Sequence, residues 1–387
     1  MENVFIEGVG STKFGQHSDR TAVDLAVEAS LNAIEDAKVD LDKIGTVYLG
    51  NFVSGVLTGQ EVLAGLVADK LGISGVPATK VEGACASGGM AFRHACMAVA
   101  SGSCEVALAV GVEKMTHAKT SLVTEALNCA LDHEVDAASG LTYPGLFALV
   151  WQAHANKYGT TRADVSAVVK KNRSNGLMNP LASMGADLTD AEINQSAMIA
   201  DPLTLFDCCP ISDGAAAVVV TRKGSGSSNG SSHPVRVLAS AQASGRARLS
   251  AHSDLCSFKA TKTAAFQAFE MSGLNPSDID LVELHDCFSI AEIIDAEDLG
   301  FMQKGHGGGW ASEGRTKVSG DLPINPSGGL EAKGHPVGAT GLGQIYEVVE
   351  QLRGRHPNQV KNANIGLTHN LGGTGVSCTV NILGAAS

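Results

Sequence analysis

The chain has 387 residues, with 28 Lys and Arg against 40 Asp and Glu, a formal net charge of −12. This balance argues against nucleic acid or an anionic lipid surface as its partner. Hydrophobic residues make up 44% of the chain and charged residues 18%, which excludes a disordered protein. With 45 Gly and only 4% aromatic residues, the composition is typical of an α/β enzyme with many tight turns.

Nothing in the sequence predicts a membrane or secreted location. No apolar run reaches the roughly 18 to 20 residues of a membrane helix, and the first residues, Met-Glu-Asn-Val-Phe, form no basic or apolar leader. The nine cysteines have no regular spacing, which favours free thiols in a reducing compartment. We therefore expect a cytoplasmic protein, and the lack of zinc-type Cys/His spacing predicts no bound metal.

Taken in chain order, the predicted elements repeat. Residues 21–48 predict an Ala-stepped helix, an acidic linker and a strand, and residues 261–284 predict the same series. The loop and helix from Cys85, with the strand that follows, match those from His335. Two Gly-led strands, at 212–220 and 373–380, form a third pair. Three pairs in one order predict two similar α/β halves whose strands are covered by helices on both faces.

A less regular segment separates the halves. Its helix-like runs, 148–158 and 161–174, alternate with polar stretches that contain Pro and Asn, so we predict an inserted loop domain. A Gly- and Ser-rich stretch at 224–232 predicts a surface loop. The predicted units are the N-terminal half (1–119 and 211–260), the inserted loop domain (120–210) and the C-terminal half (261–387).

Cys85 is the first candidate for chemistry. It follows a short predicted strand and stands at the head of a helix that runs to about Ala100. The exposed N–H groups and the dipole of a helix N-terminus lower a thiol pKa, which makes Cys85 a candidate nucleophile. A buried packing cysteine is the alternative.

His335 lies in a segment with seven Gly or Pro residues between Pro326 and Gly341. Such a run predicts a loop that exposes its backbone. No Gly-Lys-Ser/Thr follows, which argues against a nucleotide P-loop. Beside a candidate thiol we interpret His335 as a base, and a solvated loop histidine is the alternative.

Two further polar segments follow predicted strands, at the carboxyl ends where α/β sheets place ligand-contacting residues. The first is the run His285-Asp286-Cys287-Phe288 and the second is the run at 369–373. Because residues i and i+2 of an extended chain point the same way, His285 and Cys287 are expected to face one pocket while Phe288 packs inward. The alternative is a structural histidine beside a buried cysteine.

Together these four segments resemble the thiolase superfamily over nearly the whole chain. The His-Asp-Cys-Phe run and the closing His-Asn-Leu-Gly-Gly are similar to sterol-carrier-protein-type thiolases and their archaeal relatives. Other thiolases carry Asn-Glu-Ala-Phe at the first place and a Cys-x-Gly turn at the second, where this chain has His369. Cys378, on the final strand, does not take that place. The resemblance implies a layered αβαβα thiolase fold and a homodimer or homotetramer.

The resemblance also implies the reaction, CoA-dependent cleavage of a 3-oxoacyl-CoA or the reverse Claisen condensation of two acyl-CoA through an acyl-cysteine. Coenzyme A is then a substrate and no cofactor is bound permanently. By resemblance Cys85 is the nucleophile and His335 accepts its proton. The further acid/base that the carbon–carbon step requires is Cys287.

Two oxyanion holes follow from the same resemblance. His285 and the ring N–H of His335 would line one, and backbone N–H groups of Cys85 and of the closing turn would form the other. That turn comprises His369, Asn370, Leu371, Gly372 and Gly373. The candidate contacts to the CoA phosphates are Lys170, Lys171, Arg173, Arg246 and Arg248, although a Lys-Lys-x-Arg run on a helix is more often a solvated face.

Two other functions remain open at this stage. One is a decarboxylating condensing enzyme of the ketoacyl-synthase type, against which Cys287 argues because decarboxylation needs no such base. The other is a non-catalytic or partner-dependent acyl-CoA-binding scaffold, against which the intact candidate residues argue. Archaeal thiolases similar to this chain imply a hydroxymethylglutaryl-CoA synthase and a zinc-ribbon protein as partners. The lipid-binding domain of some sterol-carrier thiolases is not expected here.

Overall fold

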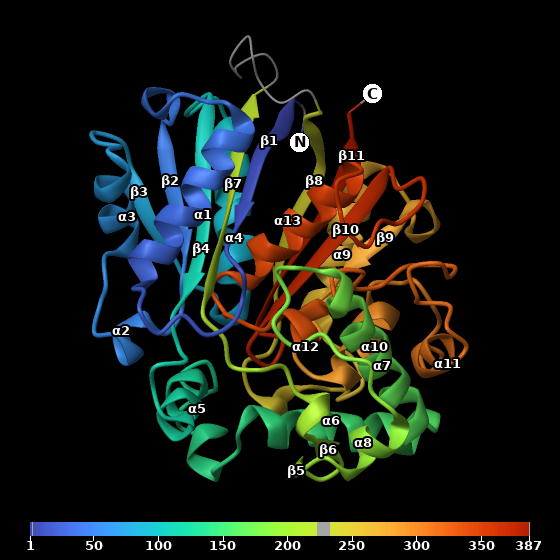
Figure 1. Ribbon diagram of the computed structural model, residues 1–387. Coiled ribbons are helices and arrows are strands. Elements are labelled where there is room, and N and C mark those ends of the chain that lie inside the picture. Colours follow the sequence, from blue (N-terminus) through green and yellow to red (C-terminus); the bar gives the residue numbers. More distant parts are fainter. Residues whose placement is uncertain (2, 223–232, 387) are drawn as a thin grey trace.

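The computed structural model describes residues 1, 3–222 and 233–386, so the predicted surface loop at 224–232 lies outside the described residues (Figure 1). The strands are β1 Val4–Ser11, β2 Thr46–Gly50, β3 Ala78–Val81, β4 Val106–Glu113, β5 Met198–Ala200, β6 Leu203–Thr204, β7 Gly214–Arg222, β8 Val235–Ser244, β9 Leu281–Glu283, β10 Ile365–Gly372 and β11 Ser377–Ala385. The helices are α1 Ala22–Ala37, α2 Ser54–Leu57, α3 Leu63–Leu71, α4 Ser87–Ala100, α5 Thr120–Asn128, α6 Tyr143–Tyr158, α7 Arg162–Met178, α8 Asp190–Gln195, α9 Lys259–Ser272, α10 Ser289–Asp298, α11 Gly307–Ser312, α12 Gly329–Lys333 and α13 Thr340–Leu352.

The described strands of the main sheet follow the order β3-β2-β4-β7-β1-β8-β11-β10-β9. In the first half β2 and β4 are parallel, and β7 and β1 continue antiparallel. The second half repeats this pattern with β9, β10, β11 and β8. Strands β1 and β8 meet through two residue pairs where the halves join. The predicted duplication is therefore confirmed in the strand pairing.

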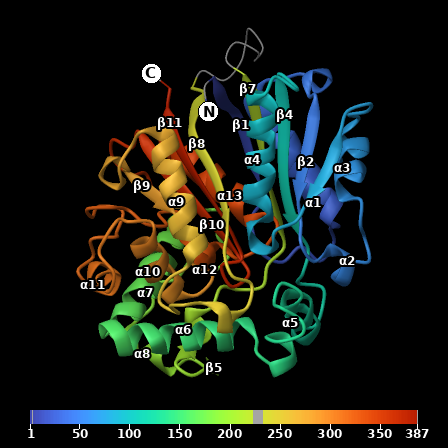
Figure 2. The ribbon, with the colours of Figure 1, turned by 180° about the vertical axis from the view of Figure 1, so that it is seen from behind.

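Helices cover both halves in layers (Figures 1 and 2). Helices α1 and α3 pack on the first half, α9 packs on the second, and α4 and α13 pack together and contact strands of both. The approach of α1 to β1 is close, since a Cβ at Gly8 or Gly10 would lie 2.1 or 2.3 Å from an α1 carbonyl oxygen. The buried alanines of α1 and the glycines of β1 thus permit the predicted αβαβα layering.

The residue boundaries differ from the predicted units in one place. Strand β8 falls in the segment 211–260, predicted to belong to the N-terminal half, yet it pairs along its length with β11 and is the counterpart of β1. An alternating strand pattern does not mark which neighbour a strand will take, which is why the sequence missed this. The segment 120–210 holds α5 to α8 and lies below the sheet in Figure 1.

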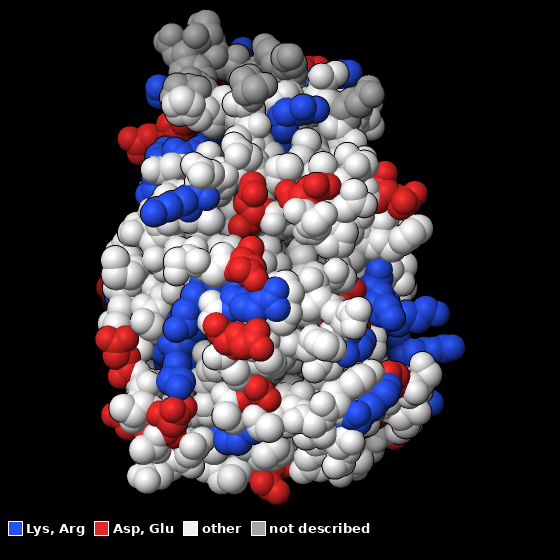
Figure 3. Space-filling model, turned by 90° about the vertical axis from the view of Figure 1, so that its right-hand side faces the viewer, with Lys and Arg blue, Asp and Glu red and all other residues white. Residues whose placement is uncertain are grey.

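The surface charge is mixed (Figure 3), and the helices are too short or too polar to span a membrane, as far as the structure describes them. Figure 3 shows a face on which Lys and Arg side chains are interspersed with Asp and Glu, in keeping with a modest, dispersed net charge. Among the described residues, no helix is long and apolar enough to cross a membrane.

Candidate active site

A cavity of about 330 Å³ brings together residues from four distant segments. Cys85 enters it from the 3₁₀ turn that precedes α4, and His285 and Cys287 from the loop after β9. His335 follows α12, and Gly373 follows β10. The four side chains singled out in the sequence thus line one apolar cavity.

The turn that carries Cys85 is tightly held. Ala84 has a left-handed φ of 53°, a conformation that a residue with a Cβ adopts only under constraint. Its N–H donates to the Glu82 carboxylate at 2.6 Å, and its carbonyl accepts the Ser87 hydroxyl at 2.6 Å. These contacts fix the backbone that aims the Cys85 side chain.

The thiol of Cys85 is protonated in the resting protein. Burial raises its pKa to about 12, although the N–H of Gly373 donates to the sulfur. The predicted lowering by the helix N-terminus does not prevail, because the apolar cavity removes the solvation on which a thiolate depends. A base close to Cys85 is therefore required to generate the nucleophile.

His335 is placed to be that base. Burial lowers its pKa to about 3, so the ring is neutral. Its Nδ1 lies 2.6 Å from the Thr340 hydroxyl, and its buried Nε2 has no hydrogen-bond partner. Ligand-type atoms of Cys85, His285 and His335 all lie within 4.8 Å of one another. A neutral imidazole nitrogen therefore faces the region of the thiol.

His285 and Cys287 complete the polar lining of the cavity. The rings of His285 and His335 meet edge to face, with centroids 4.9 Å apart. Burial, and then His335, lower the pKa of His285 well below its usual value. Burial also raises the pKa of the Cys287 thiol. Both rings are thus neutral and both thiols protonated.

The closing segment 369–373 contributes less than predicted. Residues up to Gly372 belong to β10 and pair with β11, so only Gly373 follows the strand and lines the cavity. The ring of His369 is fully buried, with Nε2 3.0 Å from the Thr261 hydroxyl, and Leu371 packs in the core. Of the five residues, Gly373 is therefore the one whose N–H reaches the Cys85 sulfur, and the oxyanion hole predicted for this turn narrows to that residue.

Two of the predicted CoA-phosphate contacts are buried. Lys171 pairs with Glu292 at 3.0 Å and donates to the Ile324 carbonyl at 2.7 Å. Arg173 is 3% exposed and donates to the Met184 carbonyl at 3.1 Å. Both face the protein interior, so their assignment to CoA was wrong.

The other three predicted cations lie at the surface. Lys170 pairs with Asp190 at 2.8 Å and Arg248 with Asp132 at 2.9 Å. Arg246 is exposed and lines a second cavity of about 610 Å³. Of the five cations, Arg246 is therefore the one that lines a site open to a ligand.

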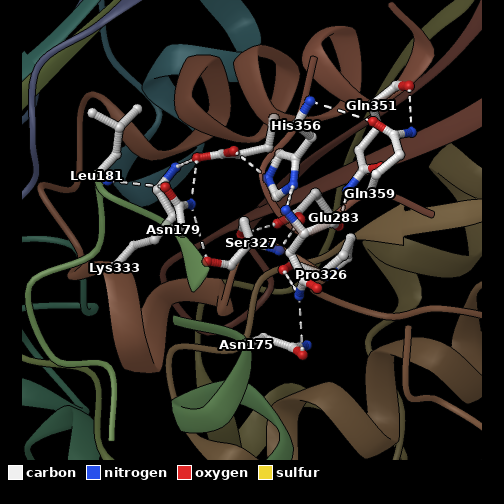
Figure 4. Close-up of polar contacts among 12 residues, drawn as sticks. Asn175, Asn179, Leu181, Glu283, Pro326, Ser327, Lys333, Gln351, His356 and Gln359 are labelled. Carbon is white, nitrogen blue, oxygen red and sulfur yellow. Dashed lines mark hydrogen bonds and ion pairs between the residues drawn. The ribbon is translucent and has the colours of Figure 1, made fainter. Parts of the chain in front are cut away.

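A buried ionic cluster supports the segment that leads to His335 (Figure 4). Lys333 pairs with Glu347 of α13, which also accepts hydrogen bonds from Asn179 at 3.1 Å and His356 at 2.9 Å. Burial opposes ionisation of Glu347, but Lys333 and His356 outweigh it and lower the pKa to about 2. The predicted exposed loop at Pro326–Gly341 is thus a buried segment held by charge.

Replacing Glu347 with Gln is expected to lower the free energy of unfolding by about 3–5 kcal/mol, because it leaves Lys333 buried without its counter-charge. Urea unfolding measures this loss. The matched control is Glu350→Gln on the same helix, whose partner Arg355 is exposed and whose loss should stay below about 1 kcal/mol. Equal losses in the two variants would contradict a special role for the Lys333 pair.

Sequence reasoning missed several residues and contacts of the site. The Thr340 side chain, which holds His335, was not predicted, nor was the Glu113 carboxylate that accepts the Gly338 N–H at 3.1 Å. Asn370 was predicted for its backbone N–H, whereas its side chain contacts His285. Cys209 lines the cavity, and its N–H donates to the Cys287 carbonyl. The adjacent cysteines 208 and 209 were visible in the sequence but matched no motif.

Cys85, His285 and His335 are also a group that a metal ion would fit, because their ligand atoms are mutually close and Cys and His are ligands that zinc accepts. The absence of a metal stays a prediction.

Comparisons with known proteins give the family of the chain. The thiolase N-terminal domain model matches residues 4–186, and the model described as thiolase C-terminal domain-like matches residues 241–385. An acetyl-CoA acetyltransferase of Methanothermobacter thermautotrophicus is 47% identical over 99% of both chains. Human sterol carrier protein 2 is 34% identical over 96% of this chain and 70% of that protein.

Solved structures share the fold. The Ltp2-ChsH2(DUF35) aldolase has a TM-score of 0.85 at 28% identity, over 99% of this chain and 98% of that chain. Human mitochondrial 3-ketoacyl-CoA thiolase in complex with CoA has a TM-score of 0.76 at 18% identity, with 99% and 98% covered. The chain therefore belongs to the thiolase family, as an acyltransferase that cleaves 3-oxoacyl-CoA with CoA or runs the reverse condensation.

Proposed function

We propose that Cys85 carries the acyl group and that His335 takes its proton. The supporting observation is the protonated, partly buried thiol beside an imidazole whose Nε2 has no partner. In the cleaving direction, sulfur attacks the 3-oxo carbon while Nε2 accepts the S–H proton. The bond between the α- and β-carbons then breaks, and its electron pair leaves on the enolate of acetyl-CoA.

Cys287 returns the proton to that enolate. Its thiol lines the same cavity and burial keeps it protonated, which suits a group that must donate. CoA thiol then attacks the acyl-cysteine and gives its proton to the Cys287 thiolate, while His335 returns its proton to the departing Cys85 sulfur. In the condensing direction the same groups act in reverse, with the Cys287 thiolate removing the α-proton of acetyl-CoA.

Short acyl chains fit this site best. The cavity is small and apolar, and Phe147 and Phe288 stack in its wall with ring centroids 4.6 Å apart. The similarity to an archaeal acetyl-CoA acetyltransferase supports the same choice. We therefore infer acetoacetyl-CoA and acetyl-CoA as the substrates.

The test is to follow loss of the 3-oxoacyl thioester when the protein meets acetoacetyl-CoA and CoA, and acylation of Cys85 by acetyl-CoA with mass spectrometry. Thiolysis together with acetylation at Cys85 is the expected result. Failure with every short and medium 3-oxoacyl-CoA would contradict the proposed function and favour a scaffold that lacks catalysis or requires a partner.

The phosphates of CoA are expected in the second cavity. Arg246, Lys259 and Lys262 line it and are all exposed, which offers three cations to the nucleotide end of CoA. Phe258, just before α9, approaches Phe147 of the catalytic cavity with ring centroids 6.0 Å apart, so the two cavities border one segment.

The double variant Lys259→Glu/Lys262→Glu is expected to raise the KM for CoA roughly tenfold or more, because two attractions become repulsions. The matched control is a second substrate, acetoacetyl-pantetheine, which carries no nucleotide and should keep its KM. An equal rise for both substrates would contradict phosphate binding at this cavity.

We also propose a homodimer or homotetramer in the cytoplasm. Within the described residues β3 pairs with β2 alone, and an edge strand with a free side invites pairing with a second copy. All nine cysteines are free thiols, which suits a reducing compartment. A hydroxymethylglutaryl-CoA synthase and a zinc-ribbon protein stay proposed partners on the family resemblance.

A further inference from the structure

The side-chain amide of Asn370 has its orientation fixed by two backbone groups. The Gly89 N–H, which can only donate, lies 3.3 Å from Oδ1. The Cys85 carbonyl, which can only accept, lies 2.9 Å from Nδ2. The amide nitrogen Nδ2 of Asn370 therefore faces the His285 ring, and it lies 3.2 Å from Nδ1 of that ring. Because one proton serves Cys85, the second is free to donate to His285.

The hydrogen bonds of His335 fix the other tautomer, with the ring proton on Nδ1. The Thr340 hydroxyl has one proton, and its oxygen lies 3.2 Å from the Pro336 carbonyl, which can only accept. The hydroxyl oxygen is then left to accept from Nδ1 of His335 at 2.6 Å. The proton of the His335 ring therefore sits on Nδ1, and Nε2 carries a lone pair without a partner.

We infer that Asn370 is a positioning residue that fixes His285 as the tautomer protonated at Nε2, so that one histidine of the cavity donates while its neighbour His335 accepts. Among the described residues, the hydrogen bond of the His285 ring is the one at Nδ1, and the ring lines the cavity. His285 thus offers an N–H to a substrate oxygen and does not compete for the Cys85 proton.

This assignment deepens the proposed function, on which its catalytic consequence rests. In the resting site the developing enolate oxygen has one ring N–H available, that of His285. His335 adds a second only while it holds the proton taken from Cys85. The order of events therefore places the oxyanion contact on His285 and the base on His335.

The direct test is the ¹⁵N NMR spectrum of protein labelled at histidine, in which ring nitrogens with and without a proton are distinguished. His285→Gln and His335→Gln identify the two sets of signals. The expected result for the unmodified protein is a proton on Nε2 of His285 and on Nδ1 of His335. A proton on Nδ1 of His285 would overturn the inference. The NMR measurement requires neither turnover nor an Asn370 variant that folds.

The second test is Asn370→Asp, whose carboxylate accepts from His285 Nδ1 and so reverses the tautomer. Thiolysis of acetoacetyl-CoA is expected to fall about 10²–10³-fold, the loss typical of a missing oxyanion donor, while acetylation of Cys85 falls far less. The matched control is Asn381→Asp, another buried asparagine, whose amide contacts Ser240 and Thr368 on neighbouring strands.

The control should keep thiolysis and the His285 signals unchanged. An Asn370→Asp protein that keeps Nε2–H, or reverses the tautomer without loss of thiolysis, would overturn the inference. The two proposals fail separately. If the tautomers are as expected but no thiolysis occurs, the proposed function is contradicted and the tautomer inference is not. If thiolysis occurs but His285 carries its proton on Nδ1, the inference is contradicted and the proposed function is not.

Discussion

Replacing Cys85 with Ala is expected to abolish acetylation by acetyl-CoA and to lower thiolysis of acetoacetyl-CoA by at least about 10⁴-fold, as when a covalent nucleophile is removed from other enzymes. The physical reason is that, in the proposed function, both half-reactions pass through the thioester on this sulfur. Mass spectrometry of the protein after incubation with acetyl-CoA, with peptide mapping, measures the first effect, and loss of the 3-oxoacyl thioester measures the second.

Cys96→Ala is the matched control, since Cys96 lies on the helix that follows Cys85, is fully buried and packs in the core. It should keep acetylation at the wild-type site. Persisting thiolysis in the Cys85 variant, or an acetyl group on another cysteine, would contradict the assignment. Among the cysteines, Cys85 is the one that follows the strained Ala84 turn and accepts an N–H from Gly373.

The fold was predictable because the sequence patterns of its helices and strands are local and occur twice in the chain. Four strands of one half have counterparts in the other, and the series of helix, acidic turn and strand recurs, as α1 with β2 and α9 with β9 show. Apolar periodicity reveals such elements. It does not reveal which edge a strand joins, and β8 was therefore assigned to the wrong half.

The candidate site was predictable in part, for a related reason. Cys85, His285, Cys287 and His335 stand in short motifs, and the structure places all four at one cavity. Their electrostatics were not predictable. The expected low pKa of Cys85 rested on its helix alone, whereas the cavity that raises it is built from segments far away in the chain.

The burial of charged residues could not be predicted from the sequence. A Lys-Lys-x-Arg run on α7 has the pattern of a solvated face, yet Lys171 and Arg173 are interior and Lys170 is not. The reason is that Lys171 finds Glu292, a carboxylate 121 residues away, and a paired charge tolerates burial that an unpaired one does not. Such partners leave no local signal in the sequence.

Replacing Cys287 with Ala separates the two chemical steps. Acetylation of Cys85 by acetyl-CoA is expected to stay within about tenfold of the wild-type rate, while thiolysis and condensation fall about 10²–10⁴-fold, the range contributed by a positioned acid or base. Acylation needs only the thiol and its base, whereas the carbon–carbon step needs a proton delivered to or taken from the α-carbon. Rapid-quench mass spectrometry measures the first rate and thioester absorbance the second.

Cys209→Ala is the matched control, because Cys209 lines the same cavity, has a thiol whose pKa burial also raises, and donates its N–H to the Cys287 carbonyl. If removal of either thiol lowered thiolysis equally, the effect would be one of packing and Cys287 would lose its role as the acid/base. A selective loss in the Cys287 variant, with Cys85 still acetylated, assigns the proton transfer to Cys287, since the two variants remove the same thiol group from one apolar wall.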